Sequence, residues 1–164
     1  MTDPASTTAI IARPHGESWR GRYLHSYGGP GDLGPILHHR ARAALPAEGG
    51  IDALIRTLID EHTGWQRLHE DGERLGNCRC HDPEPASTSW FDREQLTPGQ
   101  AARASYAYIL GPAAMRIELN VGGDWRHLHT VRHTRPQGAP VFDLICARAH
   151  ELLEIAAWDT DPLN

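Results

Sequence analysis

The three cysteines and the histidines near them are the side chains best suited to chemistry in this sequence. Cys78 and Cys80 stand two positions apart with His81 next to them, whereas Cys146 and His150 lie four positions apart near the other end of the chain. Zinc prefers thiolate and imidazole ligands. Cys146 and His150 would face the same way on a helix, because residues i and i+4 are neighbours on its surface. The sequence therefore predicts a structural zinc site formed by Cys78, Cys80, Cys146 and His150.

Other interpretations of the same residues stay open. Cys146 can be a small buried core residue while Cys78 and Cys80 lie unmetallated at the surface, or these two can form a redox pair. The odd cysteine count argues against a disulfide framework, and the closeness of Cys78 and Cys80 argues against an unstrained bridge between them. His62 and His69 are alternative metal ligands.

A glycine-rich turn is the second candidate site. Gly29-x-Gly31-x-x-Gly34 matches the dinucleotide fingerprint, in which backbone N–H groups and a helix N-terminus hold a pyrophosphate. The context differs from a dinucleotide-binding unit, because the next helix leads to another helix and not to a parallel strand. The alternatives are a turn that needs positive φ angles and a pocket for a small anionic ligand, lined by His25, Tyr27, Gly29, Gly31 and Asp32.

A row of histidines is the third candidate. Trp125, His127 and His129 alternate along a predicted strand, so all three are expected on one face, with His133 nearby. Such histidines could bind a metal or act as acid–base groups. No carboxylate joins them at a fixed spacing, and the chain contains no nucleophile elbow, P-loop or H-E-x-x-H motif. An enzyme that uses these histidines is therefore a rival hypothesis.

The first half of the chain predicts a hairpin, two helices and a long loop. Thr7–Ala12 and Trp19–Tyr27 have the composition of paired strands. A helix is expected over Leu33–Leu45, with Asp32 as its N-cap. The apolar stripe of Gly50–Trp65 has helical period, and Gly64 and Trp65 should end that helix. Residues 67–89 lack periodicity and are expected to form an irregular loop.

The second half predicts a meander and a closing helix. Ser105–Leu110, Ala114–Val121 and Trp125–Arg132 are β-prone, and Gly122-Gly123 joins the last two as a hairpin. Val141–Trp158 has a broad apolar face for a helix, formed by Val141, Leu144, Ile145, Ala149, Leu152, Leu153 and Ala156. We therefore expect a single α+β domain over residues 1–164, with an antiparallel sheet of about five strands and about three helices on one face.

Composition narrows the classes of partner. The net charge of the 164-residue chain is −5, which argues against non-specific binding to duplex nucleic acid, although Arg126–Arg135 is locally basic. No apolar run approaches the roughly 20 residues that cross a bilayer, and the N-terminus does not have the pattern of a secretion signal. A cytoplasmic location is expected.

Two segments resemble a known group of proteins. Residues 21–30 read G-R-Y-L-H-S-Y-G-G-P, and Ala53–Leu58 with Gly64-Trp65 read A-L-I-R-T-L and G-W. They resemble uncharacterised actinobacterial and phage-encoded proteins with the patterns G-R-Y-V-H-W-D-G-Y-P and D-x-x-L-R-T-L-x-x-x-x-x-G-W. Ser26, Tyr27 and Gly29 depart from the first pattern. The resemblance implies a link to phages or mobile elements and supplies no chemistry.

Taken together, these features predict binding rather than catalysis. We expect a small cytoplasmic accessory or regulatory protein that contacts a protein or a small anionic ligand. A zinc-stabilised interaction module and an enzyme using the meander histidines are the alternatives. The sequence leaves the oligomeric state open.

Overall fold

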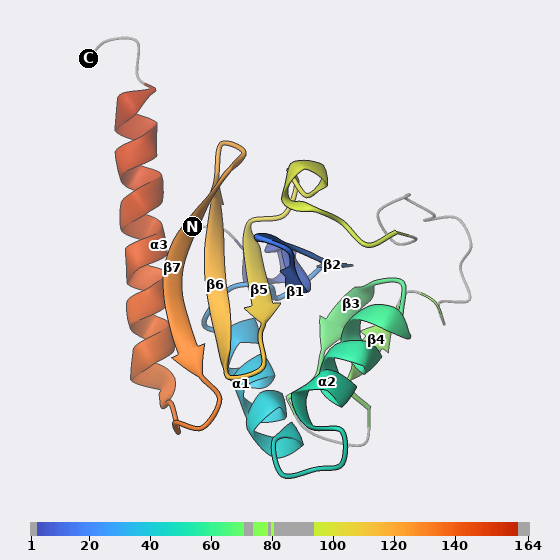
Figure 1. The fold of residues 1–164 in the computed structure, drawn as a ribbon. Coiled ribbons are helices and arrows are strands. Elements are labelled where there is room, and N and C mark those ends of the chain that lie inside the picture. Colours follow the sequence, from blue (N-terminus) through green and yellow to red (C-terminus); the bar gives the residue numbers. More distant parts are fainter. Residues whose placement is uncertain (1–2, 71–73, 79, 81–93, 161–164) are drawn as a thin grey trace.

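The computed structural model describes residues 3–70, 74–78, 80 and 94–160. Within them, seven strands form one sheet in the order β4-β3-β2-β1-β5-β6-β7 (Figure 1). The strands are β1 (Ala9–His15), β2 (Ser18–Leu24), β3 (Trp65–Leu68), β4 (Gly76–Cys78), β5 (Tyr106–Leu110), β6 (Ala114–Val121) and β7 (Asp124–Arg132). The helical elements are α1 (Leu33–Ala44), α2 (Gly50–Ile55), the π-helical turn η2 (Arg56–Asp60), α3 (Ala139–Asp159) and the 3-10 turns η1 (Pro4–Ser6) and η6 (Pro98–Gln100).

The sheet is mixed, so the prediction of an antiparallel sheet is wrong while the α+β class is confirmed. The β1–β2 hairpin and the β5–β6–β7 meander are antiparallel, as expected. The two units join through a parallel pairing of β1 with β5, and β2 pairs in parallel with β3. Parallel neighbours need a long crossover connection. Between β2 and β3 the chain supplies one through α1, α2 and η2.

The segment predicted as an irregular loop contains ordered strands. β3 and β4 form an antiparallel pair, in which Leu68 lies opposite Gly76 and Trp65 lies opposite Cys78. This hairpin adds the two strands that the sequence pattern missed, because each strand is too short to show a period. Residues 71–73, 79 and 81–89 of the predicted loop lie outside the described residues.

The helix predicted over Gly50–Trp65 ends at Asp60. Its stripe of Ile51, Ile55, Leu58 and Ile59 is buried as expected. Trp65 instead begins β3, and its indole N–H donates to the carbonyl of Leu58 over 2.9 Å. The end of η2 and the start of β3 are therefore held together by a buried tryptophan.

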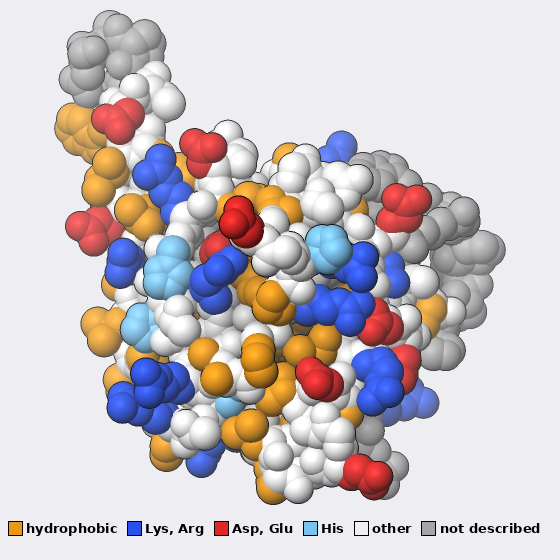
Figure 2. All heavy atoms as spheres, in the orientation of Figure 1, with side chains coloured by type: hydrophobic (Ala, Val, Ile, Leu, Met, Phe, Trp, Pro, Cys, Tyr) orange, Lys and Arg blue, Asp and Glu red, His pale blue; other side chains and the backbone are white. Residues whose placement is uncertain are grey.

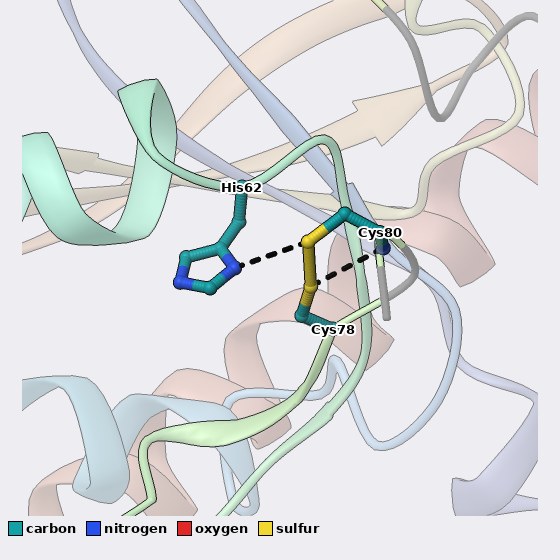
Figure 3. A group of neighbouring side chains, drawn as sticks. All are labelled: His62, Cys78 and Cys80. Atoms are coloured by element: carbon teal, nitrogen blue, oxygen red, sulfur yellow. Dashed lines mark hydrogen bonds between the residues drawn. A yellow bond between two sulfur atoms is a disulfide. The ribbon is translucent and has the colours of Figure 1, made fainter. Parts of the chain in front are cut away.

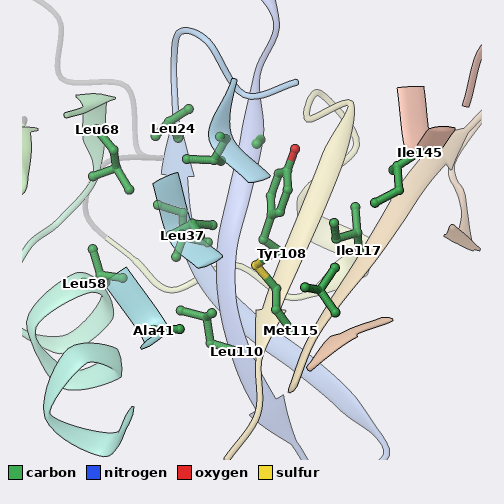
Figure 4. Close-up of a cluster of buried hydrophobic side chains, with 14 of the residues drawn as sticks. Leu24, Leu37, Ala41, Leu58, Leu68, Tyr108, Leu110, Met115, Ile117 and Ile145 are labelled. Carbon is green, nitrogen blue, oxygen red and sulfur yellow. The ribbon is translucent and has the colours of Figure 1, made fainter. Parts of the chain in front are cut away.

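Each face of the sheet has its own core. All three α-helices and η2 pack on one face, where they meet Ile11, Tyr108, Met115 and Ile117 (Figure 4). The other face is covered by the segment that contains η6, through Leu96, Ala101 and Ala104, which pack on Ile10, Ala12, Trp19, Tyr23, Ala107 and Ile109. The prediction of helices on one face therefore agrees with the packing.

The closing helix is rotated relative to the predicted apolar face. Phe142, Ile145 and Ala149 are buried, whereas Leu144 is 70% exposed and Leu153 is also exposed. Phe142 sets this rotation, because its ring packs where a side chain at Gly34 would otherwise lie. Among the described residues, no helix has both the length and the apolar character needed to cross a membrane.

Candidate functional site

A group of three potential metal ligands gathers where η2 ends and the β3–β4 hairpin begins. His62 follows η2 by two residues, Cys78 is the last residue of β4, and Cys80 lies two positions further on. Trp65 lies opposite Cys78 in the hairpin, so the pairing of β3 with β4 carries the cysteines back beside His62. The three side chains point toward one another (Figure 3).

The distances in this group are short. One ligand atom from each of His62, Cys78 and Cys80 lies within 4.8 Å of the others. His62 Nδ1 is 3.4 Å from Cys80 Sγ, and the Cys80 backbone N–H donates to Cys78 Sγ over 3.2 Å. The His62 ring also packs on Trp65, with ring centroids 4.5 Å apart. The imidazole is therefore oriented by a buried tryptophan.

Cys78 and Cys80 form a disulfide with each other, although their closeness in sequence argued against an unstrained bridge. Their Cα atoms are 5.5 Å apart, within the range usual for disulfides. A disulfide sulfur has no thiolate to offer a metal. The group can hold a metal only after the bridge is reduced.

Cys146 and His150, the other two predicted zinc ligands, do not belong to this group. α3 packs against β6 and β7, and the strand order places these at the opposite edge of the sheet from β4. Cys146 is half-buried close to Gly31. His150 is exposed and lies 3.1 Å from Glu154 of the same helix. The predicted four-ligand site is thus not assembled, and His81 lies outside the described residues.

The residues predicted to line one pocket at the glycine-rich turn lie in two separate places. Gly29, Gly31 and Asp32 line a hollow of about 300 Å³ together with Tyr106 and Cys146. Among the described residues that line it, none is an arginine or a histidine, and Asp32 is acidic. The charge of the hollow therefore does not favour an anion.

His25 and Tyr27 lie apart from that hollow, beside β3. The His25 N–H donates to the carbonyl of Trp65 over 3.0 Å, and the guanidinium of Arg67 lies 4.1 Å from the centre of the Tyr27 ring. Tyr27 is also the residue with positive φ in this turn, at 57°. The five predicted ligand-binding residues therefore do not share one pocket.

The histidine row is broken by a β-bulge. His129 lies opposite Ile117, whose side chain is in the helix-side core, whereas His127 lies opposite Glu118, which bonds to Trp19 on the other side. The register shift between these two pairs puts His127 and His129 on opposite faces, so the expectation of a shared face is wrong. His133 is fully buried, 2.8 Å from the Gly111 carbonyl oxygen.

No protein-family model matches the chain, and the same holds for curated proteins and for solved structures. The function must therefore be argued from the site itself. Its decisive residue, His62, is one of the two alternative ligands named from the sequence. What singles it out is its place three residues before Trp65, the strand partner of Cys78.

Proposed function

We propose that this protein acts by binding rather than by catalysis, and that His62, Cys78 and Cys80 form a metal site controlled by thiol oxidation. The observation that carries the proposal is the convergence of one imidazole nitrogen and two sulfurs within 4.8 Å. In the oxidised protein the sulfurs bond to each other. In the reduced protein the same atoms become three ligands for one ion.

Conversion of the disulfide into a metal site needs only a reductant and the metal ion. A dithiol reductant gives two electrons and two protons to the Cys78–Cys80 bond and becomes a disulfide itself. The metal then displaces the protons of the two thiols and binds a neutral His62. Zinc suits this set, because it prefers sulfur and nitrogen ligands in tetrahedral geometry, and water can occupy the fourth position.

This placement supports a regulatory role rather than a catalytic one. A bound ion would tie His62, just after η2, to the end of β4, whereas the disulfide joins only Cys78 and Cys80 at the end of β4 itself. A change between the two states alters this corner of the sheet and leaves the fold intact. We propose that a zinc-responsive, thiol-sensitive accessory protein is the best description of such a molecule. The meander histidines supply less support for an enzyme, since His127 and His129 lie on opposite faces.

Metal titration of the reduced and the oxidised protein tests the proposal. We expect the reduced protein to bind about one equivalent of Zn²⁺ or Co²⁺ per chain, with a sulfur-to-cobalt charge-transfer band, and the oxidised protein to bind neither. His62→Ala, Cys78→Ser and Cys80→Ser should each weaken binding by more than about 100-fold, since even outer-shell changes cost 10- to 100-fold.

Two matched variants serve as controls. His69→Ala removes a histidine of the same hairpin that contacts Asn77, and Cys146→Ser removes the cysteine at the other edge of the sheet. Both should bind metal as the unaltered protein does. Less than about one tenth of an equivalent bound to the reduced protein, or binding that depends on Cys146, would overturn the proposal.

A further inference from the structure

The outer side of α3 carries large apolar side chains that are exposed to solvent in the part of the chain that the structure describes. Leu144 and Trp158 are each 70% exposed, and Ile155 is 51% exposed. The C-terminal turns of α3 extend beyond the sheet (Figure 1), and hydrophobic side chains are visible on this projecting end (Figure 2, upper left). α3 therefore has a second apolar surface besides the one that packs on the sheet.

The exposed side chains follow the spacing of a helix–helix seam. Leu144, Arg148, Glu151, Ile155 and Trp158 succeed each other at steps of four, three, four and three residues, and all five are exposed. This heptad spacing keeps side chains on one stripe that faces a partner helix. We call these five residues the α3 seam. Small Ala147 lies beside it, where it allows a close approach of another backbone.

The α3 seam is complementary to itself. When two copies of α3 run antiparallel about a two-fold axis between Ala149 and His150, Leu144 faces Ile155 of the second copy. In the same arrangement, Arg148 faces Glu151 of the second copy. Leu144 and Ile155 thus meet each other and each of the two charges meets its opposite, twice over, as an isologous interface requires, while Trp158 lies opposite Val141 of the second copy.

A hollow beside the seam fits such a partner. It has a volume of about 540 Å³ and is lined by Leu144, Ala147, Arg148, Glu151, Leu152 and Ile155. In antiparallel helix pairs a side chain of one helix enters a hole formed by residues of the other. β7, the edge strand of the sheet, lies alongside α3 and borders the same region through Arg126 and His127.

We propose that α3 pairs with α3 of a second copy of this chain, antiparallel and along the α3 seam. The seam has one arginine and one glutamate at consecutive positions, flanked by apolar residues. This favours a second copy over an unrelated protein, because the seam already contains both halves of the charge pattern. The proposal is independent of the metal site, which lies at the opposite edge of the sheet. The seam is short, so we expect a dimer that dissociates in the micromolar range.

Charge reversal tests the pairing. In Arg148→Glu both facing charges become negative, and in Glu151→Arg both become positive. Sedimentation velocity of the reduced protein from about 5 to 500 µM should show a wild-type dimer, with the dissociation constant raised at least about tenfold in each single variant. The two variants mixed in equal amounts should associate again, since every facing pair becomes opposite in sign.

The controls separate this seam from other surfaces. Glu154→Arg reverses an exposed charge on α3 outside the seam and should dimerise like the wild type. Far-ultraviolet circular dichroism should show that all the variants, whose altered side chains are exposed, remain folded. A wild-type monomer over the whole range would overturn the proposal. Single variants that dimerise normally, or a mixture of the two variants that stays monomeric, would also overturn it. A monomeric wild type or a monomeric mixture would indicate that the exposed side of α3 binds an unrelated protein instead.

Discussion

Gly34, in the first turn of α1, lies directly beneath the ring of Phe142 in the first turn of α3. A Cβ atom on Gly34 would be 2.6 Å from Phe142 Cδ1 and 2.7 Å from Cε1. The last glycine of the apparent dinucleotide fingerprint is therefore explained by packing between two helices. Phe142 in turn fixes the rotation of α3, which buries Ile145 and leaves Leu144 outside.

We expect Gly34→Ala to destabilise the protein by about 1–3 kcal/mol, as overpacking of a close-packed core does. Helix propensity alone would favour alanine by about 1 kcal/mol. A decrease in the free energy of unfolding would therefore indicate that the added Cβ clashes with the Phe142 ring. Denaturant unfolding measures it. Gly99→Ala is the control, because a Cβ there would meet no atom within 4 Å. A more stable Gly34→Ala protein would show that the two helices separate easily.

The stability of the protein should fall in mild acid because of His38. Burial lowers the pKa of His38, with the nearby charges of Arg42 and His133 acting in the same direction and the Arg135 carbonyl acting against them. Between this lowered pKa and the ordinary value of about 6.5, the unfolded chain binds more protons than the native one. The free energy of unfolding therefore holds its full value above about pH 6.5 and decreases as the pH falls below it.

Unfolding of the wild type and of His38→Gln between about pH 7.5 and 5 checks this. The variant should be less dependent on pH over that range, because glutamine does not titrate. Parallel pH profiles for the two proteins would assign the acid sensitivity to another group.

Cys146 should react slowly with alkylating reagents. Burial raises the pKa of its thiol, and the charges of Asp143 and Asp32 add to this, while the Gly31 backbone opposes it. Since the thiolate is the nucleophile, the fully reduced native protein should be modified several-fold more slowly at Cys146 than at exposed Cys80 near pH 8. Peptide mass spectrometry after timed alkylation gives the two rates. The difference should vanish in denaturant; if it persists there, the fold is not its cause.

Glu118 should stabilise the fold as a hydrogen-bond acceptor on the face of the sheet opposite the helices. Its carboxylate accepts a hydrogen bond of 3.0 Å from the buried Trp19 indole and pairs with Arg116 over 2.9 Å. Glu118→Ala leaves the indole N–H without this acceptor and should lower the free energy of unfolding by about 1–3 kcal/mol. Glu118→Gln retains an acceptor oxygen and should lose less. Equal losses in the two variants would mean that packing, and not the hydrogen bond, sets the value.

The local elements of this protein could be predicted from the sequence. The β1–β2 hairpin, the β5–β7 meander, α1 and α3 appear where composition and apolar period place them. These patterns are properties of a few consecutive residues, so they can be recognised without knowledge of the rest of the chain. The closeness of Cys78 and Cys80 is of the same kind, since two intervening peptide units cannot separate them far.

The assembly of these elements was decided only by the tertiary structure. The parallel pairing of β1 with β5 depends on covering both faces of the sheet at once, which no single segment encodes. That strand order puts Cys146 at one edge and Cys78 at the other, and it brings in His62 through the pairing of Trp65 with Cys78. Likewise, one bulged residue in β7 sends His127 and His129 to opposite faces, because side chains alternate with a period of two. The sequence by itself identifies the reactive side chains, whereas long-range strand pairing determines which of them lie close together.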